Sequence, residues 1–317
     1  MKYDPRDFRN HHPIFRRDYD VLTSVIKDAY GIIREYVLLR RTGLFLYARP
    51  RTGKTRCANI TKHLLNLEFE NCQVVRFSAD LRGQAKNDSA IVIDILESES
   101  QFIPKRSSYR ELMTKLIIYI KTRLDSLEGD QFVLMIDEMQ MLSEQDFRVL
   151  MVLHNKLELI GIKMTTIGFA QPEILERRSA MFVTKSHNLI ARFLSEPIRF
   201  EGCCSKSDLK FILNAYDCDK VYPEGSGCTY TAFFLPEAYE NGFRLASHTS
   251  VIWGALEDAA SEIIEGGVPM EHTTMTIENI LIRSNSLDGP GYSLSKKMVD
   301  DSVAHSSLKA FSGLMSS

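Results

Sequence analysis

A short stretch near residue 50 combines the residue types that bind a nucleotide phosphate. It reads Ala-Arg-Pro-Arg-Thr-Gly-Lys-Thr over residues 48–55, directly after the apolar run 43–47. A glycine lets the backbone close around an anion, amides at a helix start point at the phosphates, the lysine neutralises their charge, and the last threonine hydroxyl can hold Mg²⁺. The predicted nucleotide contacts from this loop are Arg51, Thr52, Gly53, Lys54, Thr55 and Arg56.

The first residue of this loop departs from the usual pattern. Ala48 stands where a glycine is usual, so only the tight turn at that position is in question. The glycine, lysine and threonine that do the phosphate and metal chemistry are all present.

A second acidic element is expected to complete the site. The apolar run 132–136 is followed directly by Asp137 and Glu138. Asp137 would join the Mg²⁺ shell with Thr55, and Glu138 would orient and deprotonate the water that attacks the γ-phosphate of ATP. An adjacent acid pair favours hydrolysis over transfer to a second substrate. The alternative is an apolar strand that simply ends in a solvated acidic turn.

A polar side chain after the next strand could reach between the γ-phosphate and the water. Gln171 is the first candidate and Thr166 the second, against the alternative of an ordinary strand-ending turn.

Two arginines are candidates by position for contacts at the γ-phosphate. Arg192 stands just before the last expected strand, where it could reach the nucleotide of a neighbouring subunit as an arginine finger. Arg177 and Arg178 are its rivals, and a surface salt bridge is the alternative. Arg244 opens the second domain and could contact the γ-phosphate.

Basic residues between the second and third strands suggest a polyanion-binding face. Their surroundings hold hydroxyls and few acids, which suits phosphate contact, and nothing resembles a base-reading helix. Binding there would be sequence-tolerant and salt-sensitive, and an ordinary exposed loop is the alternative. The candidates are Arg82, Lys86, Lys105, Arg106 and Arg110.

Apolar strands that alternate with helices predict the elements that position these residues. The pattern is that of an α/β fold whose parallel five-stranded sheet is covered on both faces. Helical periodicity after about residue 204 predicts a small all-helical lid domain. We expect strands at 44–48, 73–77, 132–136, 163–168 and 197–200. The expected segments are a helical, basic N-terminal segment (1–40), the nucleotide-binding core (41–203), the lid (204–283) and a flexible, Ser-rich tail (284–317).

Composition indicates an ordinary globular protein. The 317 residues are 44% hydrophobic and 25% charged, with no apolar run of membrane-span length and no secretory signal, so a cytoplasmic location is expected. The six cysteines lack metal-ligand spacing and predict reduced thiols. The net charge is −2, but residues 1–56 carry thirteen basic and six acidic side chains, which is compatible with a local polyanion face.

Taken in order, the phosphate loop, Asp137-Glu138, residues 168–173, Arg192 and Arg244 resemble an AAA+ ATPase of the initiator type. The segment 240–245, which leads into 259–267, is similar to the transposition regulators of the TnsC/TniB family. The compact length resembles the versions that serve CRISPR-guided transposons.

This resemblance implies an ATP- and Mg²⁺-dependent homo-oligomer, a ring or a helical filament, on double-stranded DNA. It would link a target-selection protein (TniQ-like) to the transposase subunits, and hydrolysis would disassemble it. Two alternatives remain open: a nucleotide-switched signalling scaffold that binds no DNA, and a helicase loader or replication initiator. Initiators usually append a DNA-reading domain, which the polar stretch beyond residue 285 does not resemble.

Overall fold

The computed structural model describes residues 11–79, 88–260 and 266–316. The chain forms two compact units. One comprises Asp28–Pro50 and Lys54–Phe200; the other comprises Met1–Lys27, Arg51–Gly53 and Glu201–Ser317. We call them the sheet unit and the helical unit.

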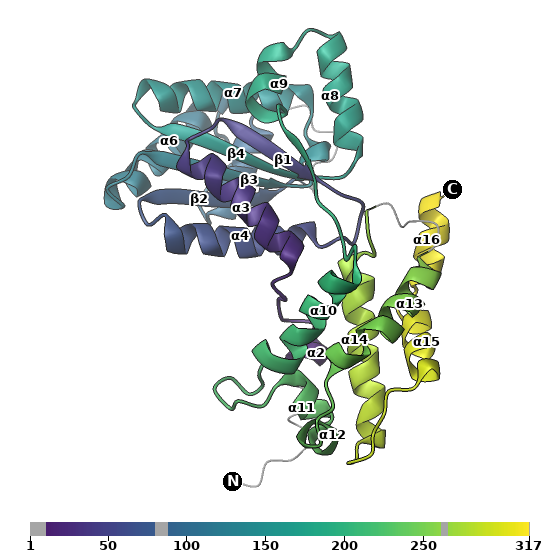
Figure 1. Cartoon of the computed structure of the whole chain (residues 1–317). Helices are drawn as coiled ribbons and strands as arrows, with labels where there is room; N and C mark the ends of the chain where they lie inside the picture. The colour runs from purple at the N-terminus through teal and green to yellow at the C-terminus, as the bar shows by residue number, and fades with distance from the viewer. Residues whose placement is uncertain (1–10, 80–87, 261–265, 317) are drawn as a thin grey trace. The chain divides into compact units, whose positions relative to one another are not determined.

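The sheet unit is built on five parallel strands, as the sequence predicts (Figure 1). Their order is β2-β3-β4-β1-β5, so β4 lies between β1 and β3. Because all strands are parallel, the segments that follow β1, β3 and β4 meet at one edge of the sheet. The strands are β1 (Gly43–Tyr47), β2 (Cys72–Ser78), β3 (Gln131–Asp137), β4 (Lys163–Ala170) and β5 (Pro197–Arg199).

Helices cover both faces of this sheet (Figure 1). Every residue of β3 is buried, as a central strand between two helical layers requires. Alternate β3 residues such as Phe132 and Leu134 enter the core formed with α5–α9, while α3 and α4 lie on the other side. The helices are α3 (Ser24–Leu38), α4 (Lys54–Glu68), α5 (Ala90–Ser98), α6 (Tyr109–Ser126), α7 (Glu144–Leu159), α8 (Glu173–Val183) and α9 (His187–Phe193).

Local sequence signals account for two of these helix starts. The Ser108 hydroxyl accepts from the Glu111 amide, and the Glu111 carboxylate accepts from the Ser108 amide, which is a capping box at the start of α6. Ser143 and Asp146 form the same arrangement at the start of α7. Each box satisfies two backbone N–H groups that the first turn cannot pair.

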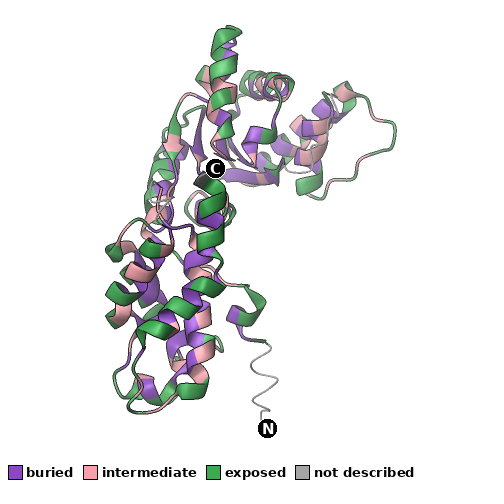
Figure 2. Cartoon of the chain, turned by 90° about the vertical axis from the view of Figure 1, so that its right-hand side faces the viewer, coloured by how far each residue is buried: buried purple, intermediate pink, exposed green. Residues whose placement is uncertain are grey.

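The helical unit has its own buried core (Figure 2). The amides and carbonyls of Cys203 and Val268 form an isolated antiparallel bridge within it. Its elements are α2 (Pro13–Arg16), α10 (Lys206–Asn214), the π-helical turn η2 (Ala215–Asp219), α11 (Tyr230–Phe234), α12 (Pro236–Glu240), the 3₁₀ turn η3 (Leu245–His248), α13 (Thr249–Ala259), α14 (Met270–Ser284), the 3₁₀ turn η4 (Asn285–Leu287), α15 (Lys296–His305) and α16 (Leu308–Ser316).

The expectation of a flexible tail from residue 284 is wrong for the described residues. This stretch forms α15 and α16, and Val299 and Leu308 are fully buried in the core of the helical unit. Apolar residues at Val299, Val303, Leu308 and Phe311 carry the packing, and the abundant serines around them conceal that pattern in the composition. The other expected boundaries also shift, because residues up to Lys27 group with the helical unit while the rest of α3 groups with the sheet.

Three further observations on the described residues concern membrane spans, cysteines and metal sites. No helix among the described residues is long and apolar enough to cross a membrane. All six cysteines are free thiols in the structure. Within the described ranges, no group of three or more His, Cys, Asp or Glu side chains is arranged to hold a metal ion by itself.

Candidate active site

The loop after β1 begins as an extension of the sheet. Ala48 is buried, and its amide donates to the Ala170 carbonyl at the end of β4 over 3.1 Å. Positive φ angles in the loop fall at Arg51 (64°) and Gly53 (103°), not at its first residue. Ala48 therefore continues the β1 ladder, and a glycine is not needed there.

Lys54 is the first residue of α4 and is only 6% exposed. Its Nζ donates to the carbonyls of Ala48 over 2.8 Å and Arg49 over 3.0 Å, so the ammonium lies beside the loop backbone. Burial lowers the pKa of this amine, and the negative charges of Glu138, Asp137 and Glu173 partly offset that effect. The site thus holds a desolvated cation, the kind of group that binds a phosphate strongly.

The other predicted loop residues differ in environment. Thr52 is buried, whereas Thr55 and Arg56 are exposed in the first turn of α4. Arg51 makes its contacts within the helical unit: its carbonyl accepts from the Glu271 amide, and its guanidinium lies 3.7 Å from the Glu271 carboxylate and 5.4 Å from the centre of the Phe311 ring.

Asp137, the last residue of β3, is 2% exposed and holds two donors. Its Oδ2 accepts from the Arg76 guanidinium over 2.6 Å, and its Oδ1 accepts from the Glu138 amide over 3.1 Å. Arg76 stands two residues before the end of β2, the neighbouring strand. Arg76 is not among the residues predicted from the sequence; its only signal is an arginine between the apolar Val75 and Phe77.

Glu138 turns the chain sharply after β3. It has φ 54° and ψ 40°, a left-handed conformation that is uncommon outside glycine and that concentrates at functional sites. Its carboxylate accepts from the side-chain amides of Gln140 and Gln171, the latter over 3.1 Å. The Gln140 side-chain oxygen in turn accepts from the Gln171 amide over 2.9 Å. Two glutamines therefore fix the orientation of the carboxylate.

The turn is anchored beneath by Met139, which is fully buried. It packs against Gly168 of β4, where an added Cβ would overlap the Met139 sulfur and lie 3.0 Å from Phe45 Cβ. Gly168 thus provides the space that lets the Glu138 turn lie on the sheet.

Sheet order decides between the two residues predicted after β4. Because β4 lies between β1 and β3, Gln171 follows the strand next to Glu138 and contacts it. Thr166 pairs with Gly43 at the amino end of β1 and is fully buried. It lies five residues before Gln171, about 16 Å along the strand, so Thr166 is not at the site. Gln140 was missed in the sequence, although its place two residues after Glu138 was a usable signal.

Arg192 lies near the amino ends of the strands, opposite the end of the sheet that carries the phosphate loop. An added Cβ at Gly43, which opens β1, would lie 2.6 Å from the Arg192 carbonyl, and the guanidinium donates to Asn155 of α7. The length of β1 separates this position from the phosphate loop that follows the strand, so Arg192 does not serve its own chain's loop. Of its rivals, Arg178 donates to the Leu194 carbonyl over 2.7 Å, and Arg177 is half-buried on α8.

Arg244 belongs to the helical unit. Its guanidinium stacks on the Tyr239 ring, 3.4 Å from the ring centre, and donates to the carbonyls of Tyr239 and Phe243. These contacts lie within residues 239–244, which run from the end of α12 to the residue before η3.

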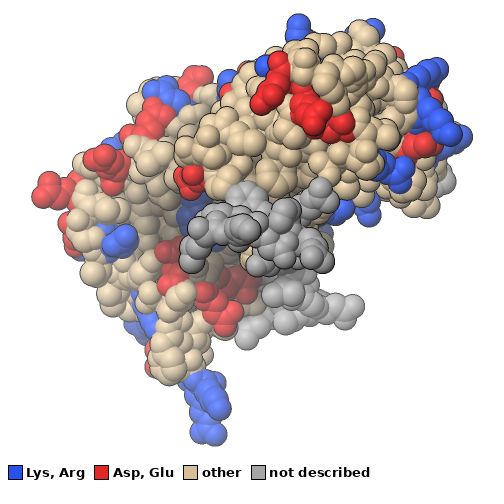
Figure 3. All heavy atoms as spheres, turned by 90° about the horizontal axis from the view of Figure 1, so that it is seen from below, with Lys and Arg blue, Asp and Glu red and all other residues tan. Residues whose placement is uncertain are grey.

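Three of the predicted polyanion contacts are described. Lys105 and Arg106 are exposed in the turn before α6, and Arg110 is exposed in its first turn. Arg82 and Lys86 lie outside the described residues. In the view of Figure 3, Lys and Arg side chains occur in separate places among Asp and Glu, so that view shows no single basic face.

The sequence of the sheet unit matches a known family. The model of the AAA domain family matches residues 39–177, which contain β1–β4, the phosphate loop, Asp137, Glu138 and Gln171. The chain carries an AAA+ ATPase domain. A five-stranded parallel sheet that is followed in the chain by a helical unit is the AAA+ arrangement.

Two similar proteins are connected with DNA by their names. An ORC1-type DNA replication protein 1 of Thermoplasma acidophilum is 29% identical over 126 residues, which are 40% of this chain and 33% of that protein. The alignment therefore spans about a third of that relative. The Aeropyrum pernix ORC1 protein, solved in complex with DNA, aligns with a TM-score of 0.54 at 14% identity over 92% of this chain and 68% of that one. At that identity the likeness is one of fold.

The AAA+ site fits Mg²⁺ and ATP in its donor set. Asp137 and Thr55 offer the oxygen ligands that Mg²⁺ prefers, and Lys54 supplies a buried cation for the phosphates. When bound, the metal would neutralise charge that develops on the phosphate oxygens.

Proposed function

We propose that this protein is an ATP-hydrolysing regulator of transposition that oligomerises on double-stranded DNA. It would link a TniQ-like target-selection protein to transposase subunits, and hydrolysis would drive its disassembly. The observation that carries the enzymatic half of this proposal is Glu138, oriented by Gln140 and Gln171 beside Asp137 and Lys54.

Each predicted site residue would have its own role in hydrolysis. Lys54 neutralises the phosphates at the loop, while Asp137 and Thr55 hold the metal position. Glu138 accepts a proton from the attacking water through its carboxylate, whose direction is set by the two glutamine amides. Gln171, in contact with Glu138, also lies at the edge of the sheet where that water must approach.

The position of Arg192 supports assembly from several copies. This arginine lies at the amino edge of the sheet, away from its own loop, so a role at a nucleotide requires the loop of a neighbouring copy. An arginine finger supplied in trans would make hydrolysis depend on oligomer formation.

The DNA-binding half of the proposal has separate support. It rests on the TnsC/TniB-like lid sequence, on the exposed Lys105, Arg106 and Arg110, and on relatives that are named for DNA replication or were solved with DNA. Binding through these phosphate contacts would tolerate sequence changes and weaken with salt.

A replication initiator or helicase loader on the same core is the second candidate. The similarity to ORC1-type proteins favours it. The two differ in what they require of DNA, since an initiator acts at a particular sequence and the transposition regulator would assemble on any duplex.

The test is gel retention of fluorescent duplex DNA with ATP across a salt series, for wild type, Lys54→Ala and Glu138→Gln. We expect ATP-dependent, sequence-tolerant retention by wild type and by Glu138→Gln, and none by Lys54→Ala. In a parallel phosphate-release assay, turnover by Glu138→Gln should fall by about 100-fold or more. Glu176→Gln, an exposed acid on α8, is the control.

Each outcome decides between the candidates. Absence of retention at low salt would favour a signalling scaffold that binds no DNA. Strong preference for one DNA sequence over random competitor would favour the initiator. Full turnover by Glu138→Gln would show that another group deprotonates the water.

A further inference from the structure

Arg76 forms an ion pair with Asp137, the carboxylate that is expected to bind Mg²⁺. Its guanidinium donates to Asp137 Oδ2 over 2.6 Å, and the two side chains are 20% and 3% exposed. The other oxygen, Oδ1, accepts from the Glu138 amide. Both oxygens of the metal carboxylate therefore already hold donors.

The guanidinium is only partly satisfied in this position. Its Nε is buried and has no hydrogen-bond partner within the described residues. A buried donor without an acceptor is costly and calls for a physical explanation. One explanation is that Arg76 has a second arrangement in which it leaves Asp137.

Charge balance gives the reason for such a movement. Arg76 pairs with Asp137, and the Asp137 charge also acts on Lys54, which is held by the carbonyls of the loop. A divalent cation on Asp137 would meet the Arg76 charge at the same carboxylate, where the low exposure leaves little water to screen the repulsion.

We propose that Arg76 is a positioning residue that competes with Mg²⁺ for Asp137 and so sets the metal concentration at which nucleotide binds tightly. In this proposal Arg76 occupies Asp137 until the metal displaces it. This inference rests on the proposed nucleotide function and deepens it, because it concerns regulation of the same site.

The experiment is a MgCl₂ titration of the full chain with a fixed amount of N-methylanthraniloyl-ADP, followed by fluorescence anisotropy. Arg76→Met keeps the length and the apolar stem but removes the charge and all donors. We expect it to lower the Mg²⁺ concentration at half-maximal binding by about fivefold, as the loss of a partly buried ion pair implies. Affinity for the nucleotide in EDTA should stay within about twofold of wild type.

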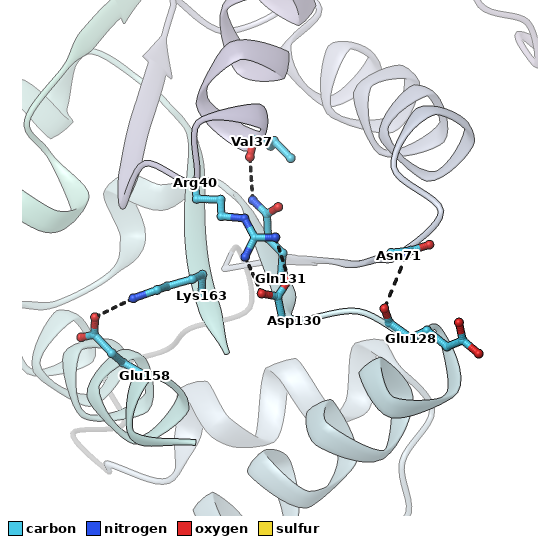
Figure 4. Close-up of polar contacts among 8 residues, drawn as sticks. All are labelled: Val37, Arg40, Asn71, Glu128, Asp130, Gln131, Glu158 and Lys163. Carbon is cyan, nitrogen blue, oxygen red and sulfur yellow. Dashed lines mark hydrogen bonds and ion pairs between the residues drawn. The ribbon is translucent and has the colours of Figure 1, made fainter. Parts of the chain in front are cut away.

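The matched control is Arg40→Met. Arg40 pairs with Asp130 over 2.6 and 2.7 Å near the amino ends of the strands (Figure 4). The variant therefore loses an Arg–Asp ion pair, in this case an exposed one, away from the site. Its Mg²⁺ midpoint should equal that of wild type. Arg76→Lys, which keeps the charge on a shorter stem, serves if the methionine variant does not fold, and should lower the midpoint by about twofold.

The possible results overturn different proposals. If wild type binds nucleotide and the midpoint of both Arg76 variants is unchanged or higher, Arg76 does not compete with the metal and this inference fails alone. If wild type binds no nucleotide at any Mg²⁺ concentration, the proposed function fails and takes this inference with it.

Discussion

Gln171 donates a hydrogen bond from Nε2 to Oε2 of Glu138 over 3.1 Å, although 33 residues separate them in the chain. The contact exists because β4 lies between β1 and β3, so the residue after β4 reaches the turn after β3. It ties the proposed general base to the strand next to the phosphate loop.

Replacing Gln171 by alanine should lower ATP turnover by roughly tenfold and leave nucleotide affinity within about twofold of wild type, because only the orientation of Glu138 is lost. Gln140→Ala should act in the same direction, and the double variant should lose less than the product of the two, since both amides serve one carboxylate. Steady-state phosphate release and nucleotide binding separate the effects. Gln145→Ala, which removes an exposed contact with Asp88, is the control.

Lys54→Ala should weaken nucleotide binding by roughly 10- to 100-fold, because a charge-assisted contact to the phosphates is lost. The midpoint of thermal unfolding should not fall, since the variant also removes a buried charge whose pKa is lowered by desolvation. Lys62→Ala on the same helix, whose amine lies 3.9 Å from Glu99, provides the comparison. Equal affinities for the two variants would remove Lys54 from the site.

Gly168→Ala should destabilise the protein by about 1–3 kcal/mol, since the new methyl group must displace Met139 beneath the Glu138 turn. Turnover should fall as well, because the displaced turn carries the base. Gly31→Ala, inside α3 with open space at the added methyl group, should instead stabilise by about 0.5–1 kcal/mol. Urea unfolding measures both, and a neutral Gly168→Ala would contradict this account of the turn.

Leu308→Ala should cost about 2–5 kcal/mol, as expected for a leucine with no exposed surface in a packed core. Leu314→Ala, at 70% exposure on the same helix, should stay within about 0.5 kcal/mol of wild type. Chemical unfolding of the two variants tests directly whether α16 belongs to the folded helical unit. A flexible tail would give two neutral substitutions.

Glu278→Gln should stabilise the protein at neutral pH but not at acid pH. Burial raises the pKa of Glu278 above its value in the unfolded chain, and the Tyr19 hydroxyl, which donates to it over 2.7 Å, offsets only part of this. The stability that its protonated form contributes is complete below the unfolded pKa and is lost as the pH rises through the folded pKa. Glutamine stays neutral, so its advantage should grow from about pH 4 to about pH 8.

Thermal unfolding across that pH range measures the difference between wild type and Glu278→Gln. Glu240→Gln, at an exposed position of the same unit, is the control. A difference that does not change with pH would show that the pKa of Glu278 is the same in the folded and the unfolded protein.

The sequence by itself determined the parallel five-stranded sheet, and it predicted Lys54, Asp137 and Glu138 as site residues. Apolar runs followed by Lys54 or by Asp137 and Glu138 carry local information, because a buried strand and a phosphate loop each require specific residue types at fixed spacing. The capping boxes at Ser108 and Ser143 are local signals of the same kind.

Only the tertiary structure decided which polar side chains meet. The order of the strands has no local signal, and it is the central place of β4 that brings Gln171 to Glu138 and leaves Thr166 buried at a distance. Arg76 reaches Asp137 because β2 pairs with β3 in the register that sets Ser78 against Asp137. Such contacts join segments far apart in the chain. They cannot be predicted from local residue patterns, because they depend on how the strands pack in the folded protein.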